Sequence, residues 1–303
     1  MNALYEVLYS MDKQTELAVI RHAYAKQIMA AAGIVDPRIQ AAYAEVRRED
    51  FLGPGPWQIL RFPGGYSVTP DADPVLLYVD QLVGLVPERK VNNGQPSLHA
   101  ALLAAAAIQD GDHVVHVGAG TGYYTAIMSF LAGVTGRVTA VEFDPGLAAR
   151  ARENLASRPN VSVYEGNGAT LTFDTADVIY VNAGVTHPAA TWLDGLSPGG
   201  RLIIPLTTDY NSRAVQPGFD AARAMRSGVY FRLQRRDSDF AARWLLPVGI
   251  IPAEGARDPE AEVALDAALE KGGWNRVTRL IRGETVPDER CWLRGPGWCL
   301  AYD

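Results

Sequence analysis

The residues best suited to bind a ligand form a glycine-rich run, HVGAGTGY, at residues 116–123. This run follows a buried apolar segment and leads into a helical pattern. Glycines let the backbone approach a ligand closely, and the N–H groups at the start of the following helix are exposed beyond them. The pattern is G-x-G-x-G, because a tyrosine replaces the third small residue of the dinucleotide-binding fingerprint. The residues expected to line the ligand are Gly118, Ala119, Gly120, Thr121, Gly122 and Tyr123.

Polar side chains follow the next three apolar segments. Glu142 closes the second segment, at the spacing where an acidic residue would accept hydrogen bonds from both hydroxyls of a ribose. Asn167 and Gly168 follow the third segment, and the Asn167 amide can accept from an adenine amine and donate to a ring nitrogen. Asn182 follows the fourth, at the edge where open α/β sheets bind ligands.

Apolar segments alternate with amphipathic helical patterns from residue 97 onwards. A helix is expected at 97–108, and further helices at 121–132, 145–158 and 188–195. Strands are expected at 113–120, 137–144, 160–166, 176–184 and 201–206. This alternation is typical of a parallel sheet covered on both faces. We expect an α/β fold of the Rossmann-like, doubly wound type, with a mostly parallel sheet.

The flanking regions have different patterns. Residues 1–75 predict an N-terminal helical region that ends in a Gly- and Pro-rich loop at 53–75. Residues 76–252 form the expected ligand-binding domain, and 253–303 an α+β extension. Segments 229–236 and 242–252 predict a strand pair that adds antiparallel strands to the sheet edge, and 259–273 predicts a helix.

Composition excludes several classes of protein. The 303 residues carry a net charge of −6, so we expect no general binding to nucleic acid. The longest apolar run, residues 98–108, is too short to cross a bilayer, so no membrane association is expected. Cys291 and Cys299 suit neither a disulfide framework nor a zinc site, and no metal is expected. No signal peptide is evident, so we expect a cytoplasmic protein with reduced thiols.

The ordered set of glycine loop, acidic strand end and polar third and fourth strand ends resembles the class I S-adenosylmethionine-dependent methyltransferases. More specifically, the chain resembles the protein-L-isoaspartate O-methyltransferase family from about residue 40 to 252. The segments that carry this resemblance are VRREDF (46–51), NNGQPSLHA (92–100), DGDHVVHVGAGTGYYTA (110–126), LSPGGRLIIPL (196–206) and RWLLPVGIIP (243–252).

One segment departs from the family pattern. Where the family has Thr-Ile-Ser before Gln-Pro, this chain has Asn92-Asn93-Gly94. The hydroxyl that the family places beside the acceptor carboxylate therefore falls on a glycine, whereas His99 is kept. Either another residue does the work of the serine, or the acceptor is not an isoaspartyl carboxylate; the segment also reads as a simple turn.

The resemblance implies methyl transfer from S-adenosylmethionine to a protein or peptide carboxylate, with S-adenosylhomocysteine as product. An ionised carboxylate needs no general base, so catalysis is mostly placement of the acceptor. The residues expected around the acceptor are Gly94, His99, Asn182 and His187; either histidine is also compatible with a purely structural role.

Three alternatives remain open. The first is a diverged methyltransferase with another peptide or a small molecule as acceptor. The second is a non-catalytic S-adenosylmethionine-binding module. The third is an RNA methyltransferase, which the acidic balance disfavours. Whether the N-terminal helices cap the site or form a homodimer is also open.

Overall fold

The computed structural model describes residues 12–61, 65–208 and 227–303. The chain divides into two compact units, one ending at Ala104 and the other running from Ala105 to Asp303. The first unit therefore extends past residue 75, and the second includes the whole segment after residue 252. Each unit is described separately below.

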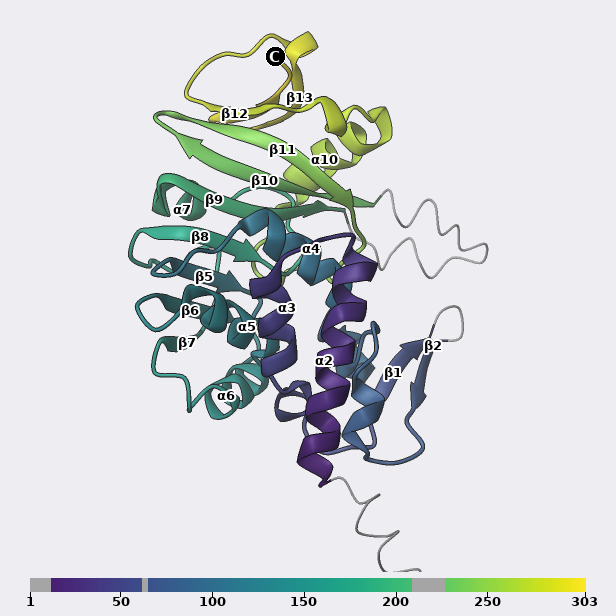
Figure 1. Ribbon diagram of the computed structural model, residues 1–303. Coiled ribbons are helices and arrows are strands. Elements are labelled where there is room, and N and C mark those ends of the chain that lie inside the picture. Colours follow the sequence, from purple (N-terminus) through teal and green to yellow (C-terminus); the bar gives the residue numbers. More distant parts are fainter. Residues whose placement is uncertain (1–11, 62–64, 209–226) are drawn as a thin grey trace, which may run out of the picture. The chain divides into compact units, whose positions relative to one another are not determined.

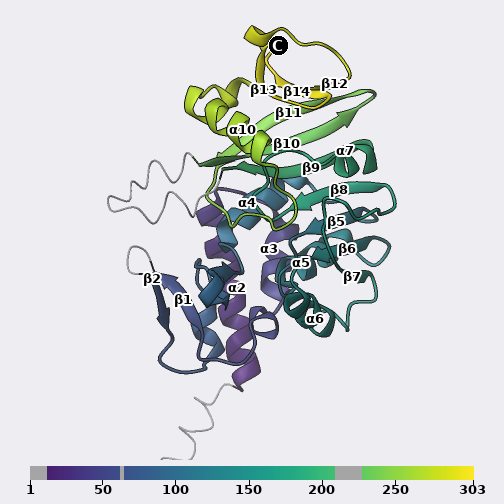
Figure 2. The same cartoon turned by 180° about the vertical axis from the view of Figure 1, so that it is seen from behind.

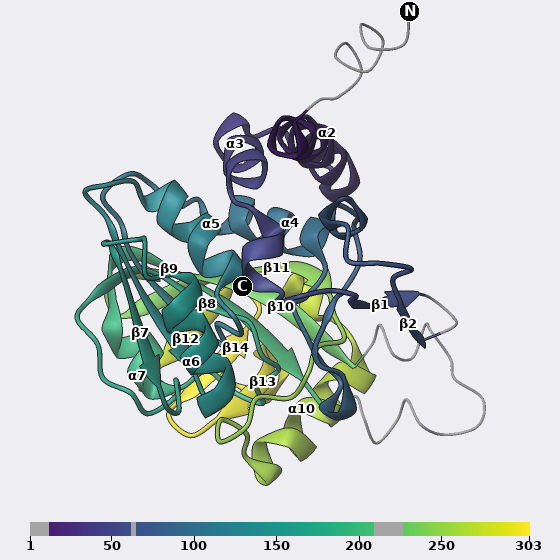
Figure 3. The ribbon, with the colours of Figure 1, turned by 90° about the horizontal axis from the view of Figure 1, so that it is seen from below.

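Two helices begin the first unit. Helix α2 (Lys13–Ala32) ends at Gly33, whose φ of 65° lies in the left-handed region that glycine tolerates. Helix α3 (Pro37–Glu45) begins after Asp36, whose side chain accepts hydrogen bonds from the backbone N–H groups of Arg38 and Ile39. The two helices lie side by side (Figure 3). They confirm the expectation of helices in this region.

The segment that we expected to be a loop, 53–75, contains a strand pair instead. Strands β1 (Gln58–Arg61) and β2 (Gly65–Val68) pair antiparallel. The prediction was wrong because it relied on the Gly and Pro content of the segment and overlooked a buried apolar residue. Ile59 is buried in a small cluster with Trp57 and Val83. Tertiary burial of this kind outweighs local turn propensity.

The remainder of the first unit consists of short elements. Strand β3 (Gly84–Val86) pairs with β4 (Val91–Asn92), and one-turn helices occupy Arg48–Phe51, Pro74–Leu77 and Pro87–Arg89. Fully buried Arg48 donates to the carbonyls of Leu77, Val79 and Gln81, so this part of the VRREDF segment is structural. Helix α4 (Pro96–Ala106) continues into the second unit.

A single sheet organises the second unit. Among the described residues it has ten strands in the order β13-β14-β12-β11-β10-β9-β8-β5-β6-β7 (Figure 1). The parallel half consists of β5 (His113–Val117), β6 (Arg137–Glu142), β7 (Val161–Glu165), β8 (Ala176–Val181) and β9 (Leu196–Thr207). The Rossmann-like, doubly wound prediction is therefore confirmed.

The antiparallel half is built from the C-terminal part of the chain. It consists of β10 (Gly228–Arg236), β11 (Asp239–Pro247), β12 (Arg279–Arg282), β13 (Cys291–Gly295) and β14 (Trp298–Ala301). The predicted antiparallel addition is confirmed, and it makes the sheet mixed. One-turn helices precede β12 and β13, at Trp274–Arg276 and Asp288–Arg290.

Helices cover both faces of this sheet. Helices α7 (Ala190–Gly195) and α10 (Pro259–Lys271) cover one face (Figure 2). They contribute Trp192 and Leu265 to the main core, which also holds Val115 of β5. His116 points to the opposite face because side chains alternate along a strand. On that face, Nδ1 of its ring forms a hydrogen bond with Oγ1 of Thr125 on α5 (Tyr123–Ala132). Helix α6 (Pro145–Asn154) packs beside β6 and β7. In the part of the chain that the structure describes, no helix combines the length and apolar character needed to span a bilayer.

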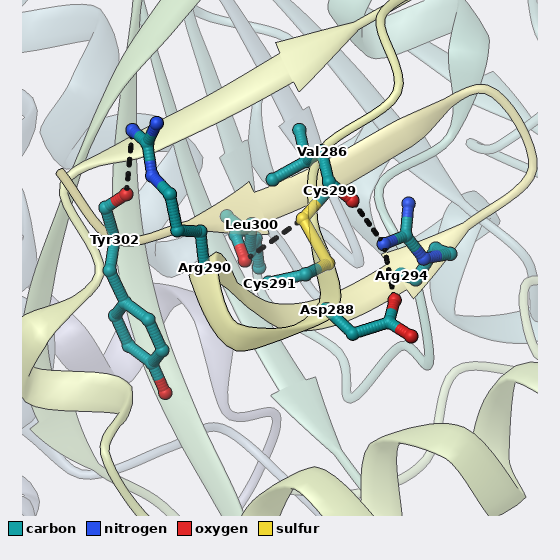
Figure 4. The surroundings of a disulfide bond; sticks show 8 residues. All are labelled: Val286, Asp288, Arg290, Cys291, Arg294, Cys299, Leu300 and Tyr302. Atoms are coloured by element: carbon teal, nitrogen blue, oxygen red, sulfur yellow. Dashed lines mark hydrogen bonds and ion pairs between the residues drawn. A yellow bond between two sulfur atoms is a disulfide. The ribbon is translucent and has the colours of Figure 1, made fainter.

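The expectation of two reduced thiols was wrong. Cys291 on β13 and Cys299 on β14 form a disulfide, and their Cα atoms are 6.1 Å apart (Figure 4). The sequence did not indicate this pairing because the two residues alone give no framework. The strand pair β13–β14 brings them into the same small apolar cluster as Val286.

Candidate active site

The glycine loop lies between β5 and α5, as the sequence predicts. Gly118, Gly120 and Gly122 all have positive φ, at 79°, 58° and 97°, which residues with a Cβ rarely adopt. A Cβ on Gly118 would lie 3.1 Å from the carbonyl oxygen of Asn182. The N–H of Gly118 donates to the carbonyl of Val141 at 2.9 Å. The loop therefore turns tightly across the ends of the neighbouring strands β6 and β8.

Glu142 holds this loop directly. It is the last residue of β6, and its side chain is only 8% exposed. Its Oε2 accepts from the N–H of Gly120 at 2.7 Å, and its Oε1 accepts from the N–H of Asp144 at 3.0 Å. Burial raises the pKa of the Glu142 carboxyl, and these backbone hydrogen bonds oppose that shift. A carboxylate has about four acceptor positions, and the backbone N–H groups of Gly120, Phe143 and Asp144 use three of them, so at least one remains for a ligand hydroxyl.

Asn167 lies in the loop after β7. Its Oδ1 accepts from the N–H of Ala169 at 2.9 Å, and its Nδ2 donates to the carbonyl of Gly255 at 2.7 Å. An amide has two N–H donors and two acceptor lone pairs, so one of each remains. A Cβ on Gly168 would collide with Val117, and the Gly168 carbonyl accepts from the indole of Trp192 at 2.7 Å. The loop after β7 is thus packed closely against β5.

Asn182 and His187 lie in the second unit, after β8. The amide of Asn182 donates to the carbonyl of Gly118 at 3.4 Å, which brings it to the glycine loop. The Nδ1 of His187 lies 3.0 Å from Oγ1 of Thr186. Burial lowers the pKa of His187, and the nearby Asp258 partly opposes this.

Gly94 and His99 lie in the first unit, one on each side of the start of α4. Gly94 has a φ of 76°, and its N–H donates to Oδ1 of Asn92 at 2.9 Å. A Cβ on Gly94 would overlap Nε2 of His99, whose side chain is 1% exposed. The imidazole therefore occupies the space in which a side chain at position 94 would begin.

Several residues around these groups were not predicted from the sequence. Asp80 caps α4, because its carboxylate accepts from the N–H and the hydroxyl of Ser97 at 2.8 and 2.6 Å. Phe143 follows Glu142 directly and is 45% exposed, so its aromatic type beside the predicted ribose ligand was a usable signal. Gly255 gave no such signal, because it lies outside the segments that carry the family resemblance.

Comparison with known proteins decides the family. The model of the family "Protein-L-isoaspartate(D-aspartate) O-methyltransferase (PCMT)" matches residues 22–217, well over half of the chain. The chain belongs to this family. The resemblance drawn from the sequence motifs is therefore confirmed, and so is the prediction of an S-adenosylmethionine-dependent methyltransferase.

Relatives of this methyltransferase give the same family name. A protein-L-isoaspartate O-methyltransferase of Rhodopseudomonas palustris strain CGA009 is 31% identical over 252 residues, which cover 80% of this chain and 98% of the relative. The protein-L-isoaspartate O-methyltransferase of Thermotoga maritima is 32% identical over 189 residues, or 61% of this chain. That match spans only 55% of the length of the T. maritima protein.

Solved structures agree on the fold. A protein-L-isoaspartate O-methyltransferase aligns with a TM-score of 0.57 at 24% identity, over 78% of this chain and 66% of that chain. A Plasmodium falciparum structure, described as a putative protein-L-isoaspartate O-methyltransferase in complex with S-adenosyl-L-homocysteine, aligns with a TM-score of 0.58 at 18% identity. That alignment covers 77% of this chain and 97% of the other. These likenesses confirm the class I methyltransferase fold.

Proposed function

We propose that this protein transfers a methyl group from S-adenosylmethionine to the side-chain carboxylate of an isoaspartyl residue in a protein or peptide, and releases S-adenosylhomocysteine. The observation that carries the proposal is the hydrogen bond from the N–H of Gly120 to Glu142. It joins the glycine loop to the acidic strand end, the two features that a nucleoside-containing cofactor requires. The family match and the name of the P. falciparum structure support the same cofactor.

The donors and acceptors around the glycine loop fit this cofactor. Glu142 keeps acceptor capacity for a ribose hydroxyl, and Asn167 keeps one donor and one acceptor for the adenine edge. The loop 118–123 lies between these residues and the start of α5, with N–H groups at a helix N-terminus. Glycine at position 168 lets this loop pack directly against Val117, where any side chain would collide.

This reaction requires the side chains of the site mainly to position the acceptor. When bound, the cofactor supplies a methyl group on a positively charged sulfur. A carboxylate oxygen of the acceptor forms the new O–C bond as the C–S bond breaks, and the electron pair stays on sulfur, so no proton moves. Residues around the acceptor therefore need only to orient it and exclude water. On the basis of the family resemblance, we assign this work to the residues expected around the acceptor, Gly94, His99, Asn182 and His187.

A second candidate is a methyltransferase of the same chemistry with a different acceptor. The observation that favours it is the glycine at position 94, where the family has serine, with the His99 ring in its place. Equal transfer to isoaspartyl and aspartyl peptides, or transfer to neither with cofactor binding intact, would favour this candidate.

The proposal is tested with labelled S-adenosylmethionine and a pair of peptides that differ only in an isoaspartyl or a normal aspartyl linkage. We expect label in the isoaspartyl peptide alone. Calorimetry with S-adenosylhomocysteine separates loss of cofactor binding from loss of acceptor recognition.

We also propose a cytoplasmic location, on the basis of composition. The Cys291–Cys299 disulfide weighs against it, because disulfides are rare in the cytosol. Cell fractionation tests this: recovery of the protein in the cytoplasmic fraction supports the location, and recovery in another fraction contradicts it.

A further inference from the structure

Residues 250–258, between β11 and α10, run across the ends of the sheet strands. We call this segment the strap. It is fixed to the loop after β8 by two backbone hydrogen bonds: the N–H of Gly184 donates to Ile251 at 2.8 Å, and the N–H of Ala253 donates back to Gly184 at 2.9 Å. Pro252 and Gly184 form an isolated parallel bridge. The strap therefore adds a short strand-like contact at the ligand edge of the sheet.

Side chains anchor the far end of the strap. The Nη1 of Arg257 donates to the carbonyl of Gly184 at 2.9 Å, and its Nη2 lies 2.9 Å from a carboxylate oxygen of Glu262 on α10. The N–H of Asp258 donates to Oγ1 of Thr186 at 3.0 Å. These contacts hold the strap from both the loop after β8 and helix α10.

The middle of the strap meets the loop after β7. The carbonyl of Gly255 accepts the Nδ2 hydrogen bond of Asn167 at 2.7 Å. Gly255 has a φ of 74°, and a Cβ on it would lie 3.0 Å from Nδ2 of Asn167 and 3.1 Å from Cε2 of Phe143. The backbone of the strap is therefore in close contact with Asn167 and with the aromatic ring that follows Glu142.

Two backbone groups together determine which way the Asn167 amide faces. Its Oδ1 must lie toward the N–H of Ala169, because that partner is a donor, and its Nδ2 must lie toward Gly255, because a carbonyl can only accept. Turning the amide over would set donor against donor and acceptor against acceptor. Neither Ala169 nor Gly255 acting alone would oppose the flip as strongly as both do together.

We propose that the strap makes the cofactor site selective for a 6-amino purine by locking the Asn167 amide. This rests on the proposed placement of adenine beside Asn167. In that placement the free lone pair of Oδ1 accepts from the 6-amino group, and the free N–H of Nδ2 donates to the ring nitrogen N1. A 6-oxo purine presents the reverse pattern, an acceptor at position 6 and a donor at N1. A free amide would match it by flipping, whereas a locked amide cannot.

The experiment compares the binding of S-adenosylhomocysteine and S-inosylhomocysteine, which differ at the purine 6-position and N1, by calorimetry on the full chain. We expect the parent protein to bind the adenosyl compound at least about 10-fold more tightly, as expected when buried hydrogen-bonding groups are mismatched. Gly255→Ala should reduce this ratio at least about 3-fold, because the added methyl group pushes the strap away from Asn167 and frees the amide.

A matched control separates the effect of freeing the Asn167 amide from the effect of backbone strain. Gly283 has a φ of 72° and nothing within 4 Å of the position of an added Cβ. Gly283→Ala therefore carries the same conformational cost, and we expect it to leave the purine ratio unchanged. If Gly255→Ala does not fold, Arg257→Met serves instead, since it removes the side-chain contacts of the strap with Gly184 and Glu262 without touching Asn167. Arg276→Met, which changes an arginine stacked on Tyr302, is its control.

The outcomes are distinct. A ratio that falls in Gly255→Ala or Arg257→Met, and in neither control, supports the lock. An unchanged ratio in both strap variants overturns it, as does a parent protein that binds both compounds equally well; in these cases cofactor binding itself stands. A parent protein that binds neither compound overturns the proposed function as well.

Discussion

The imidazole of His99 occupies the space that a side chain on Gly94 would need. The two residues lie on either side of the Gln95-Pro96 pair that begins α4, and Gly94 adopts a left-handed backbone with a φ of 76°. The family pattern keeps this histidine, so the departure from it is confined to the glycine at position 94. A serine cannot be restored at this position without moving the ring.

This relationship gives the first prediction. Gly94→Ser should lower the free energy of unfolding by about 2–4 kcal/mol, since it adds backbone strain and a collision in a buried site. Gly33→Ser is the control, because Gly33 has a φ of 65° and nothing within 4 Å of an added Cβ. Urea unfolding measures both. The double variant Gly94→Ser/His99→Ala should regain part of the stability that Gly94→Ser loses, and a Gly94→Ser variant as stable as Gly33→Ser contradicts the account.

Glu142 gives a second prediction, on cofactor affinity. Glu142→Ala should weaken S-adenosylhomocysteine binding by about 10–100-fold, as expected for the loss of hydrogen bonds to a charged acceptor. Glu165 is a matched control, because it ends the neighbouring strand β7 and pairs with Glu142 in the sheet register. Calorimetry should show no change for Glu165→Ala. Equal losses for the two variants would mean that Glu142 acts through general charge and not as a ligand.

Much of this edge of the sheet was predictable because its signals are local. The glycine loop and Glu142 each sit at a strand end that the apolar pattern identifies. The hydrogen bond between Asn167 and Gly255 joins residues 88 positions apart, so no local pattern contains it. The strand pair β1–β2 was missed because burial of Ile59 outweighs the turn residues around it. The position of the His99 ring against Gly94 depends on side-chain packing, which the spacing of residues in the sequence does not determine.

His116 gives a third prediction, on the pH dependence of stability. Complete burial lowers the pKa of His116 to about 3, against 6.5 for an exposed histidine. The unfolded chain therefore binds a proton at this residue below pH 6.5 while the folded chain does not. The free energy of unfolding should fall by at most about 1.4 kcal/mol for each pH unit below 6.5 from this group.

The test compares His116→Gln with the parent protein by urea unfolding between pH 5 and 7. The variant should have the shallower pH dependence, because glutamine does not titrate. His113 and His187, whose pKa values burial also lowers, are present in both proteins and cancel in the comparison. Parallel pH profiles for the two proteins would contradict the buried, neutral state of His116.

The disulfide gives a fourth prediction. Cys291 and Cys299 are 8 residues apart, and closing a loop of that size stabilises the folded chain by about 2.5 kcal/mol in the chain-entropy model. Cys291→Ser/Cys299→Ser should be less stable by about this amount in urea unfolding. Reducing agent should lower the stability of the parent protein and leave the variant unchanged. A parent protein insensitive to reductant contradicts the pairing.

The central claim is methyl transfer to an isoaspartyl carboxylate, and the most direct measurement is transfer from labelled S-adenosylmethionine to an isoaspartyl peptide, with the aspartyl peptide as control. The account predicts base-labile label in the isoaspartyl peptide alone, because a methyl ester hydrolyses in base. No label in either peptide from a protein that binds S-adenosylhomocysteine would contradict the claim and would indicate that the protein methylates a different acceptor.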